Sequence, residues 1–122
     1  MIYGTGIDIV EVERFQRIVE KWGDRFISRI LTDNEKHFCL NRSNSVSSIA
    51  ARFAAKEALY KSIPESLQQH AGWQDMEVIS DNSGRPHVRL FGELAAGLEN
   101  YKVHISLSHS QKSAIAIIVI EK

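Results

Sequence analysis

The stretch "GTGIDIV", residues 4–10, places one carboxylate, Asp8, inside an otherwise apolar and β-branched run. Such a run is typical of a buried strand, and the neighbouring Gly4 and Gly6 indicate a close approach of another backbone or a bend. A carboxylate is costly to bury unless it is neutralised, paired with a cation or bound to a metal. We therefore expect the rest of the sequence to supply a partner for Asp8.

The composition is that of a single soluble domain spanning residues 1–122. The chain has a mass of 13.8 kDa, with 43% hydrophobic and 25% charged residues. Lys plus Arg and Asp plus Glu both number 15, so the net charge is zero. The overall charge therefore does not indicate a nucleic acid or an anionic membrane as the partner. Any electrostatic recognition is expected to come from a local patch.

The cysteine content and the N-terminus predict a cytoplasmic protein. The single cysteine, Cys39, excludes an internal disulfide, and no Cys/His spacing resembles a structural zinc site. The N-terminus has no basic region followed by an apolar stretch, and no apolar run is long enough to span a membrane. A reducing compartment is the simpler expectation.

Helical and strand patterns alternate along the chain after a first strand over residues 2–10. The apolar residues between Val12 and Leu31 recur at helical spacing, and Gly23 is expected to weaken this helix or break it in two. Thr32 and Glu35 fit a capping box that starts a short helix ending near Leu40. Further expected elements are a long helix over 46–62 ended by Pro64, strands over 76–80 and 86–91 joined by the turn "DNSG", a short helix over 94–98, and strands over 102–109 and 113–120. The last strand is apolar on both faces, which predicts a central place in its sheet.

The long helix offers a second acidic residue, Glu57. On a helical wheel at about 100° per residue, it shares a sector with apolar residues and with Lys61. One interpretation is an exposed Glu57–Lys61 pair at i,i+4 spacing. The other is that Asp8 and Glu57 converge, and two converging carboxylates repel unless a cation or a shared proton lies between them. All-oxygen ligation with open positions suits a magnesium ion that acts together with a phosphorylated substrate.

Several cationic or polar side chains could bind the phosphates of such a substrate. Alternation in "VHISLSHS" places His104, Ser106 and Ser108 on one face of a strand, where they form either a ligand-binding row or a solvent-facing surface. Each cation is equally compatible with a solvated position. The candidates are Arg52, Lys56 and Lys61 on the long helix, and His104 and Lys112 in or beside the C-terminal hairpin.

The first long helix carries a positive ridge opposite its apolar face. It is either a solvated helix face or a docking surface for an acidic protein or a polyphosphate, where rim charges raise the association rate more than the affinity. The basic residues are Arg17, Lys21, Arg25 and Arg29 at i,i+4 spacing, with Arg14 beside Arg17.

Four blocks of the sequence together resemble the holo-acyl-carrier-protein synthase family of phosphopantetheinyl transferases. They are "GTGIDIVEVERF" at the N-terminus, "ARFAAKEALYKS" at 51–62, "SDNSGRPHV" at 80–88 and "VHISLSHS" at 103–110. The resemblance implies an α+β fold in which an antiparallel sheet packs against a long buried helix and a basic amphipathic helix. This is the half-unit of the 4'-phosphopantetheinyl transferase fold, and short members of the family assemble as homotrimers with active sites between subunits.

The resemblance also implies a reaction and a set of site residues. Family members move 4'-phosphopantetheine from coenzyme A (CoA) to a serine of an acidic apo acyl carrier protein for fatty acid biosynthesis, releasing adenosine 3',5'-bisphosphate and requiring magnesium. Asp8 and Glu57 match the metal-binding carboxylates, and Lys61 matches a lysine that contacts the reacting phosphates. Residues matching those that bind the adenosine end of CoA are Arg52, His104 and the turn with Gly84, Arg85 and Pro86, beside which Lys56 and Ser106 are further candidates. The ridge with Arg14, Arg17, Lys21, Arg25 and Arg29 matches the surface that meets the carrier protein.

The attacking serine belongs to the carrier protein, so the chain needs no nucleophile of its own. Either Glu57 or a metal-ordered water could act as the general base. The competing hypothesis is a non-catalytic module that binds a nucleotide or an acidic protein through the same ridge. A single-strand RNA binder is disfavoured, since the few aromatic residues occupy core-like positions and the net charge is zero.

Overall fold

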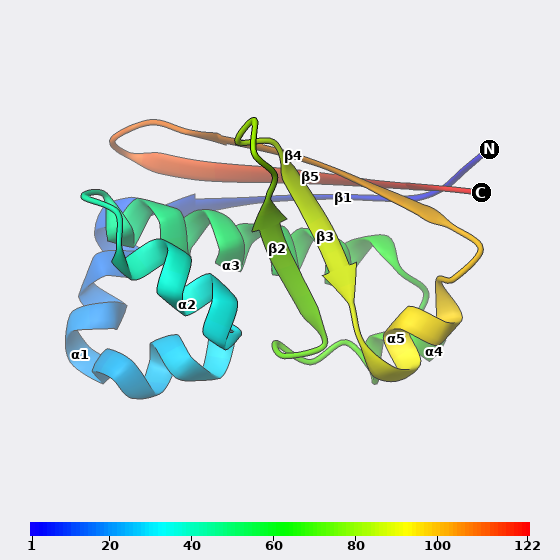
Figure 1. The fold of residues 1–122 in the computed structure, drawn as a ribbon, viewed down its shortest axis with the longest axis horizontal. Coiled ribbons are helices and arrows are strands. Elements are labelled where there is room, and N and C mark those ends of the chain that lie inside the picture. Colours follow the sequence, from blue (N-terminus) through cyan, green and yellow to red (C-terminus); the bar gives the residue numbers. More distant parts are fainter.

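A long helix, α3 (Ser45–Ser62), lies against one face of a three-stranded antiparallel sheet (Figure 1). The computed structural model describes residues 1–122. The strands of the sheet are β1 (Ile2–Glu11), β5 (Ser113–Glu121) and β4 (Lys102–His109), in that spatial order. The prediction that the last strand is central is therefore confirmed.

Small residues allow α3 to lie close to the sheet. Ala54, Ala55 and Ala58 of α3 pack in one buried cluster with Ile118 and Ile120 of β5. All of these side chains are at most 2% exposed. Burying such apolar surface is the main stabilising term of this layer, and the short alanine side chains leave little space between the helix and the sheet.

The contact between β1 and α3 is closer still, because two glycines of β1 face the helix backbone. A Cβ atom at Gly6 would overlap the carbonyl oxygen of Ala58, and one at Gly4 would overlap the carbonyl oxygen of Ser62. The predicted close backbone approach at these glycines is confirmed. This approach places the next inward-facing residue of β1, Asp8, beside α3.

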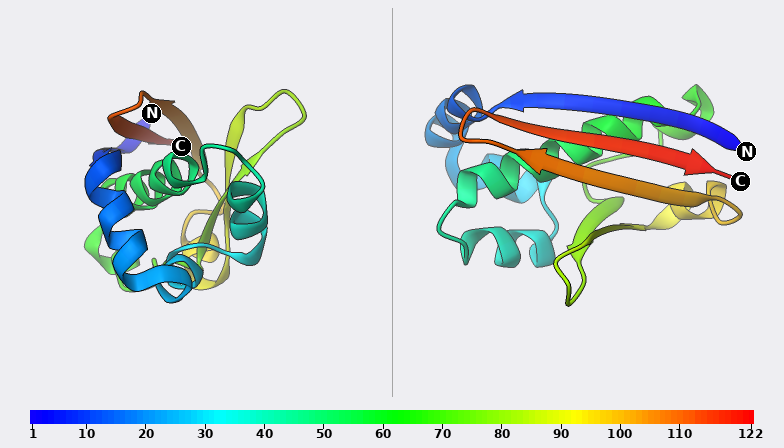
Figure 2. Two further views of the ribbon diagram at one scale, coloured as in Figure 1. Left: turned by 90° about the vertical axis from the view of Figure 1, so that its left-hand side faces the viewer. Right: turned by 90° about the horizontal axis from the view of Figure 1, so that it is seen from above.

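The outer face of the same sheet carries the apolar side chains of β1, which corrects the prediction of a buried strand. Ile7 is 60% exposed and Ile9 is 62% exposed, while the side chain of Asp8 on the inner face is only 17% exposed. Ile115 and Ile117 pair with Ile9 and Ile7 across the sheet and continue the exposed apolar surface. All the helices lie on the other face of this sheet (Figure 2).

The helix α1 (Val12–Ile30) bends at Gly23, as the sequence suggested. Gly23 has φ 62° and ψ −146°, a conformation that breaks the helical path and that L-residues rarely adopt. The residues before and after Gly23 therefore run in different directions around the end of α3 (Figure 1).

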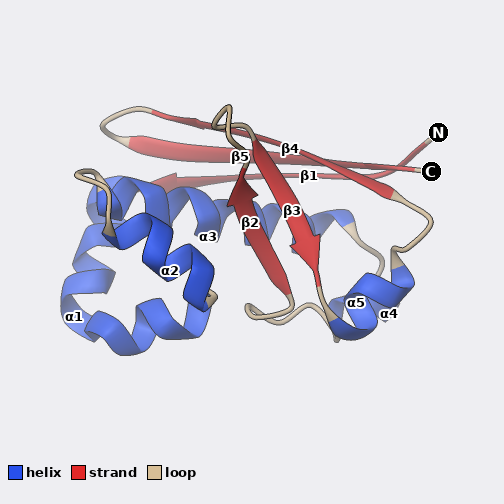
Figure 3. Cartoon of the chain, in the orientation of Figure 1, coloured by secondary structure: helices blue, strands red, loops and turns tan.

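A capping box begins the short helix α2 (Asp33–Leu40), as predicted. The backbone N–H of Glu35 donates to Thr32 Oγ1 at 3.2 Å, and the backbone N–H of Thr32 donates to Glu35 Oε1 at 2.9 Å. The predicted hairpin also forms, from β2 (Met76–Ser80) and β3 (Pro86–Leu90), and its strands contact α3 and β4 (Figure 3).

Two short helices complete the chain. The predicted short helix is α5 (Gly92–Gly97), which begins two residues earlier than expected. The other, α4 (Glu65–Gln68), was not predicted, since four residues cannot display a helical period. The α+β architecture is as expected, and none of the five helices is long and apolar enough to cross a membrane.

The contact of Gly6 with α3 makes a testable prediction for stability. Gly6→Ala forces a Cβ atom into the Ala58 carbonyl oxygen, so β1 and α3 must move apart, at a cost of about 1–3 kcal/mol. Chemical denaturation should show this loss of unfolding free energy. Thr5→Ala, on the exposed face between the two glycines, is the matched control. Equal stability of the two variants would contradict the close contact.

Candidate active site

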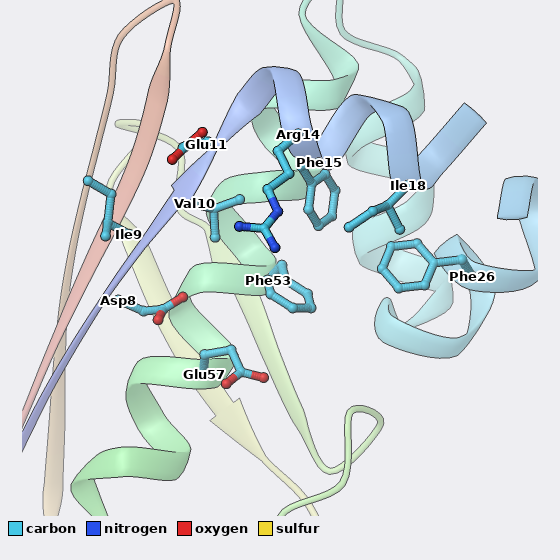
Figure 4. A pocket seen from close by; sticks show the side chains of 10 residues that line it. All are labelled: Asp8, Ile9, Val10, Glu11, Arg14, Phe15, Ile18, Phe26, Phe53 and Glu57. Atoms are coloured by element: carbon cyan, nitrogen blue, oxygen red, sulfur yellow. The ribbon is translucent and has the colours of Figure 1, made fainter. Parts of the chain in front are cut away.

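Asp8 of β1 and Glu57 of α3 line the same cavity, which has a volume of about 520 Å³. Its other walls are mainly apolar, with Phe15, Phe53 and Val10 among them. Figure 4 shows the two carboxyl groups at one end of this cavity and the guanidinium of Arg14 pointing into it. The structure thus brings together two acidic residues that lie far apart in the sequence.

The cation nearest to Asp8 is Lys61. Its Nζ donates to Asp8 Oδ1 at 2.9 Å and to the carbonyl oxygen of Ile7 at 3.2 Å. The alternative Glu57–Lys61 surface pair is not formed. Burial raises the pKa of Glu57, the charge of Asp8 raises it further, and Lys61 opposes both effects. A further cation beside Glu57 would therefore offset the cost of burying its charge and its repulsion by Asp8.

The donor set of this cavity fits a magnesium ion that also binds substrate phosphates. No group of three or more His, Cys, Asp and Glu side chains is placed to hold a metal ion, so the protein offers no complete cage for a metal. Magnesium is commonly held by one or two carboxylates, with water and phosphate oxygens completing its shell. Asp8 and Glu57 supply the two carboxylates.

A second group of predicted residues meets at the turn between β2 and β3. Gly84, Arg85 and Pro86 line a cavity of about 620 Å³ together with Ser106 of β4. The carboxylate of Asp81 shapes this turn by accepting hydrogen bonds from the backbone N–H groups of Ser83 and Arg85, at 2.8 and 3.0 Å. Hydrogen bonds from Ser83 and then His87 hold the pKa of Asp81 far below its usual range. Gly84 has a φ of 87°, which explains why a glycine is required there.

Arg52 lies in an adjoining cavity of about 420 Å³, which also includes Gly84 and Pro86. Its guanidinium lies over the ring of Phe38, with 4.4 Å between Cζ and the ring centroid, and the residue is only 5% exposed. No carboxylate pairs with it, its Nε has no hydrogen-bond partner, and burial lowers its pKa. A buried cation with an unused donor is well suited to an anionic ligand.

His104 and Ser108 lie on the same outer face of β4 as Ser106, as alternation predicted. His104 Nε2 lies 2.7 Å from Glu121 Oε1, and this hydrogen bond, followed by the charge of His104, lowers the pKa of Glu121. Lys112 is exposed in the turn between β4 and β5. Neither His104 nor Lys112 lines the cavities that contain Arg52 and Arg85.

Lys56 is buried inside the protein and does not line the cavities of Arg52 and Arg85. It is 1% exposed, and its Nζ donates to Glu35 Oε1 and to the backbone carbonyl oxygens of Ile30 and Trp73 at 2.6, 2.7 and 2.8 Å. An ammonium group has only three protons to donate. The expectation that Lys56 binds a phosphate is therefore corrected: its donors are already used inside the protein.

The bend at Gly23 divides the predicted basic ridge. Arg14 lines the cavity with the two carboxylates, whereas Arg25 and Arg29 line a neighbouring cavity of about 460 Å³. Arg17 and Lys21 line neither, and Lys21 Nζ lies 5.2 Å from the centroid of the Trp22 ring. The two cavities share Ile18 and Phe26, so a groove with basic and apolar walls leads away from Asp8 and Glu57.

Sequence reasoning missed three residues of these surfaces. Trp22 was assigned to the apolar helix face, but it is 59% exposed and lines the second groove cavity beside Ile18. Phe38 and Arg42 line the cavity of Arg52, and Arg42 lies over the same Phe38 ring, with 4.9 Å between Cζ and the ring centroid. The sequence pattern does not identify these residues as cavity-lining, because their positions depend on the bend of α1 and on the packing of α2 against α3.

The strand residues of the two groups, Asp8 and Ser106, lie at opposite edges of the three-stranded sheet. Asp8 belongs to β1 and Ser106 belongs to β4, and the whole of β5 lies between these strands. Within one chain, the carboxylate cavity and the cavities of Arg52 and Arg85 share no lining residue. The chain thus has two separate groups of candidate residues, which we call half-sites.

Comparison with known proteins assigns the chain to one family. A family model described as the 4'-phosphopantetheinyl transferase superfamily matches residues 4–118. Holo-[acyl-carrier-protein] synthase of Koribacter versatilis is 42% identical over 124 residues, covering 99% of both chains. The protein of the same name from Geobacter metallireducens is 40% identical over 125 residues, covering 100% of this chain and 99% of the relative.

Solved structures agree over the full length of the chain. The holo-[acyl-carrier-protein] synthase of Neisseria meningitidis superposes with a TM-score of 0.88 at 32% identity, covering 100% of both chains. The Bacillus anthracis enzyme, in complex with CoA (3',5'-ADP), has a TM-score of 0.82 at 35% identity, with 100% and 98% coverage.

The environment of Glu57 predicts the effect of removing its charge. The pKa of Glu57 is raised in the folded state. As pH rises above the ordinary value of 4.5, Glu57 therefore keeps its proton longer in the folded protein than in the unfolded chain. The contribution of Glu57 to the free energy of unfolding therefore falls as pH rises from 4.5 through the raised pKa, and it stays lower at neutral pH. Glu57→Gln should raise the melting temperature at pH 7 without added metal, whereas Glu65→Gln on the surface should not. A less stable Glu57→Gln variant would contradict the electrostatic account.

Proposed function

The chain belongs to the 4'-phosphopantetheinyl transferase superfamily, and from this premise we propose that it is a holo-[acyl-carrier-protein] synthase. It transfers 4'-phosphopantetheine from CoA to a serine hydroxyl of an apo acyl carrier protein and releases adenosine 3',5'-bisphosphate. We assign this reaction to fatty acid biosynthesis in the cytoplasm. The observation that carries the proposal is the convergence of Asp8 and Glu57 in one cavity beside Lys61.

In the proposed reaction, the carrier serine oxygen attacks the phosphorus on the pantetheine side of the CoA diphosphate. The bond from that phosphorus to the bridging oxygen breaks, and adenosine 3',5'-bisphosphate leaves with that oxygen. Asp8 and Glu57 would hold a magnesium ion, which when bound offsets negative charge on the diphosphate oxygens. Lys61 adds a positive charge next to Asp8 that favours the departing phosphate.

Proton transfer from the serine falls to Glu57 in this proposal, directly or through an ordered water. Glu57 lies in the same cavity as Asp8, and in the metal-free protein burial and the charge of Asp8 raise its pKa, so it is protonated more readily than an ordinary carboxylate. Protonation of Glu57 before substrate binds would remove a metal ligand. Activity should therefore fall as pH drops through this pKa.

The second half-site binds the adenosine and 3'-phosphate end of CoA. Arg52 supports this role best, since it is buried, has no carboxylate partner and has an unused Nε donor. Arg85 supplies a second, exposed guanidinium in the cavity next to it. Gly84, Pro86, Ser106 and His104 complete the proposed cofactor-binding set.

The groove along α1 is the proposed docking surface for the acidic carrier protein. It begins at Asp8 and Glu57, includes Arg14, and ends at Arg25 and Arg29. A carrier bound there would deliver its serine to the carboxylate cavity. Arg17 and Lys21 lie outside the groove, where rim charges act mainly on the association rate.

A homotrimer with active sites between subunits is the proposed assembly. In one chain the cavities of the two half-sites share no lining residue, and Asp8 and Ser106 lie at opposite edges of a sheet, so in this proposal a neighbouring copy supplies the second half-site. The exposed apolar face with Ile7, Ile9, Ile115 and Ile117 supports burial against another copy, since monomers rarely expose such surfaces. Closed rings of identical subunits form when heterologous contacts repeat around an axis.

The function is tested by following the mass of the carrier. The protein is incubated with magnesium, CoA and an apo acyl carrier protein, and mass spectrometry measures the gain of one phosphopantetheine group. Asp8→Ala and Glu57→Ala should each slow the gain by at least about a hundredfold, because charge stabilisation is lost. Glu99→Ala, an exposed carboxylate, is the control. Binding of CoA without any mass gain would instead favour the non-catalytic module.

The shared active site is tested by mixing two inactive variants. Asp8→Ala damages one half-site and Arg85→Ala damages the other. After co-expression, about one quarter of the sites should combine two intact halves and recover activity, because subunits assort at random across each interface. Activity no higher than the mean of the separate variants would overturn the shared site.

A further inference from the structure

Lys56 is a buried cation that the proposed reaction does not use. Its ammonium group contacts three separate parts of the fold: the carbonyl oxygen of Ile30 at the end of α1, Glu35 Oε1 of α2, and the carbonyl oxygen of Trp73 before β2. These distances are 2.6–2.8 Å. Lys56 thus connects α3 with three neighbouring segments through one atom.

The carboxylate that pairs with Lys56 is itself fully satisfied. Glu35 Oε1 also accepts from the backbone N–H of Thr32 at 2.9 Å, and Oε2 accepts from the backbone N–H of Val78 at 2.8 Å. Glu35 is 1% exposed. Such a buried ion pair adds little to the net free energy of unfolding, because burying its charges is costly. Its main effect is to hold the connected segments in one arrangement.

The segment held by Lys56 also supports the walls of the active site. The indole of Trp73 stacks on Phe53, with 5.1 Å between ring centroids, and Phe53 lines the carboxylate cavity. The side-chain amide of Gln74 donates to the carbonyl oxygens of Ser28, Arg29 and Leu31 at 3.1, 3.3 and 2.7 Å. Residues 73 and 74 thereby tie the end of α1 to α3.

The buried face of α3 is formed largely by short side chains, so a directional anchor has a role there. Ile49 and Leu59 are its larger apolar core residues, and the remaining core contacts come from alanines, namely Ala50, Ala51, Ala54, Ala55 and Ala58. Alanine side chains interlock weakly, so they resist rotation of a helix about its axis less than long side chains do. Lys56 precedes Glu57 directly, and any rotation of α3 would change where the Glu57 carboxylate points.

We propose that Lys56 is a positioning residue for Glu57, whose three hydrogen bonds fix the rotation of α3 and hold the Glu57 carboxylate in the cavity beside Asp8. The inference rests on the proposed function, in which Glu57 binds magnesium. It replaces the cofactor-binding role that the sequence suggested for Lys56. The ammonium group acts through the helix and the Trp73 segment without touching substrate.

The test uses the double variant Lys56→Met/Glu35→Gln, which removes the anchor together with the opposite charge of its ion pair. Ile49→Ala, a buried residue elsewhere on α3, is the control for general loss of stability. All proteins are assayed at a temperature where circular dichroism shows them folded. The magnesium concentration for half-maximal transfer should rise about tenfold in the double variant, with a lower kcat. The KM for CoA should stay near the wild-type value, because the adenosine end binds in the other half-site.

Binding of Mn²⁺, followed by electron paramagnetic resonance, provides a readout that needs no turnover. Weaker Mn²⁺ binding in the double variant than in Ile49→Ala supports the positioning role. Equal Mn²⁺ binding and an equal magnesium requirement in the two proteins would overturn it. If wild-type protein binds Mn²⁺ but never modifies the carrier, the proposed function fails while the role of Lys56 is still decided by the binding data.

Discussion

The close backbone contact between β1 and α3 is the constraint on which the rest of the site depends. Gly4 and Gly6 allow the strand to lie directly against the helix carbonyl groups of Ser62 and Ala58. The next inward position of the strand then belongs to Asp8, which faces the turn of α3 that carries Glu57. The position of the cavity therefore depends on the close contact between β1 and α3, which only glycine allows at positions 4 and 6.

Patterns of local spacing predicted most of the fold. The capping box of Thr32 and Glu35, the break at Gly23 and the apolar last strand each depend on residues near in sequence, and each is present. The exposure of Ile7 and Ile9 could not be read from the sequence, because an apolar strand face is covered either by its own chain or by another copy. The structure of one chain leaves that face open.

The site itself was only partly predictable from the residues. A helical wheel separated Lys56 from Glu57 but could not show that its partners are carbonyl oxygens of Ile30 and Trp73, which belong to distant segments. Similarly, Trp22 has the spacing of a core residue, yet it lies at the surface directly before the bend at Gly23. The separation of the two half-sites depends on strand order, which a motif does not contain.

The central claim is that Asp8 and Glu57, from different elements, bind one divalent cation that also contacts the CoA diphosphate. The most direct measurement is a crystal structure determined with CoA and magnesium. The proposed site predicts one ion with an oxygen of each carboxylate about 2.0–2.1 Å from it, together with diphosphate oxygens. An ion bound elsewhere, or carboxylates that face away from each other while CoA is bound, would contradict it.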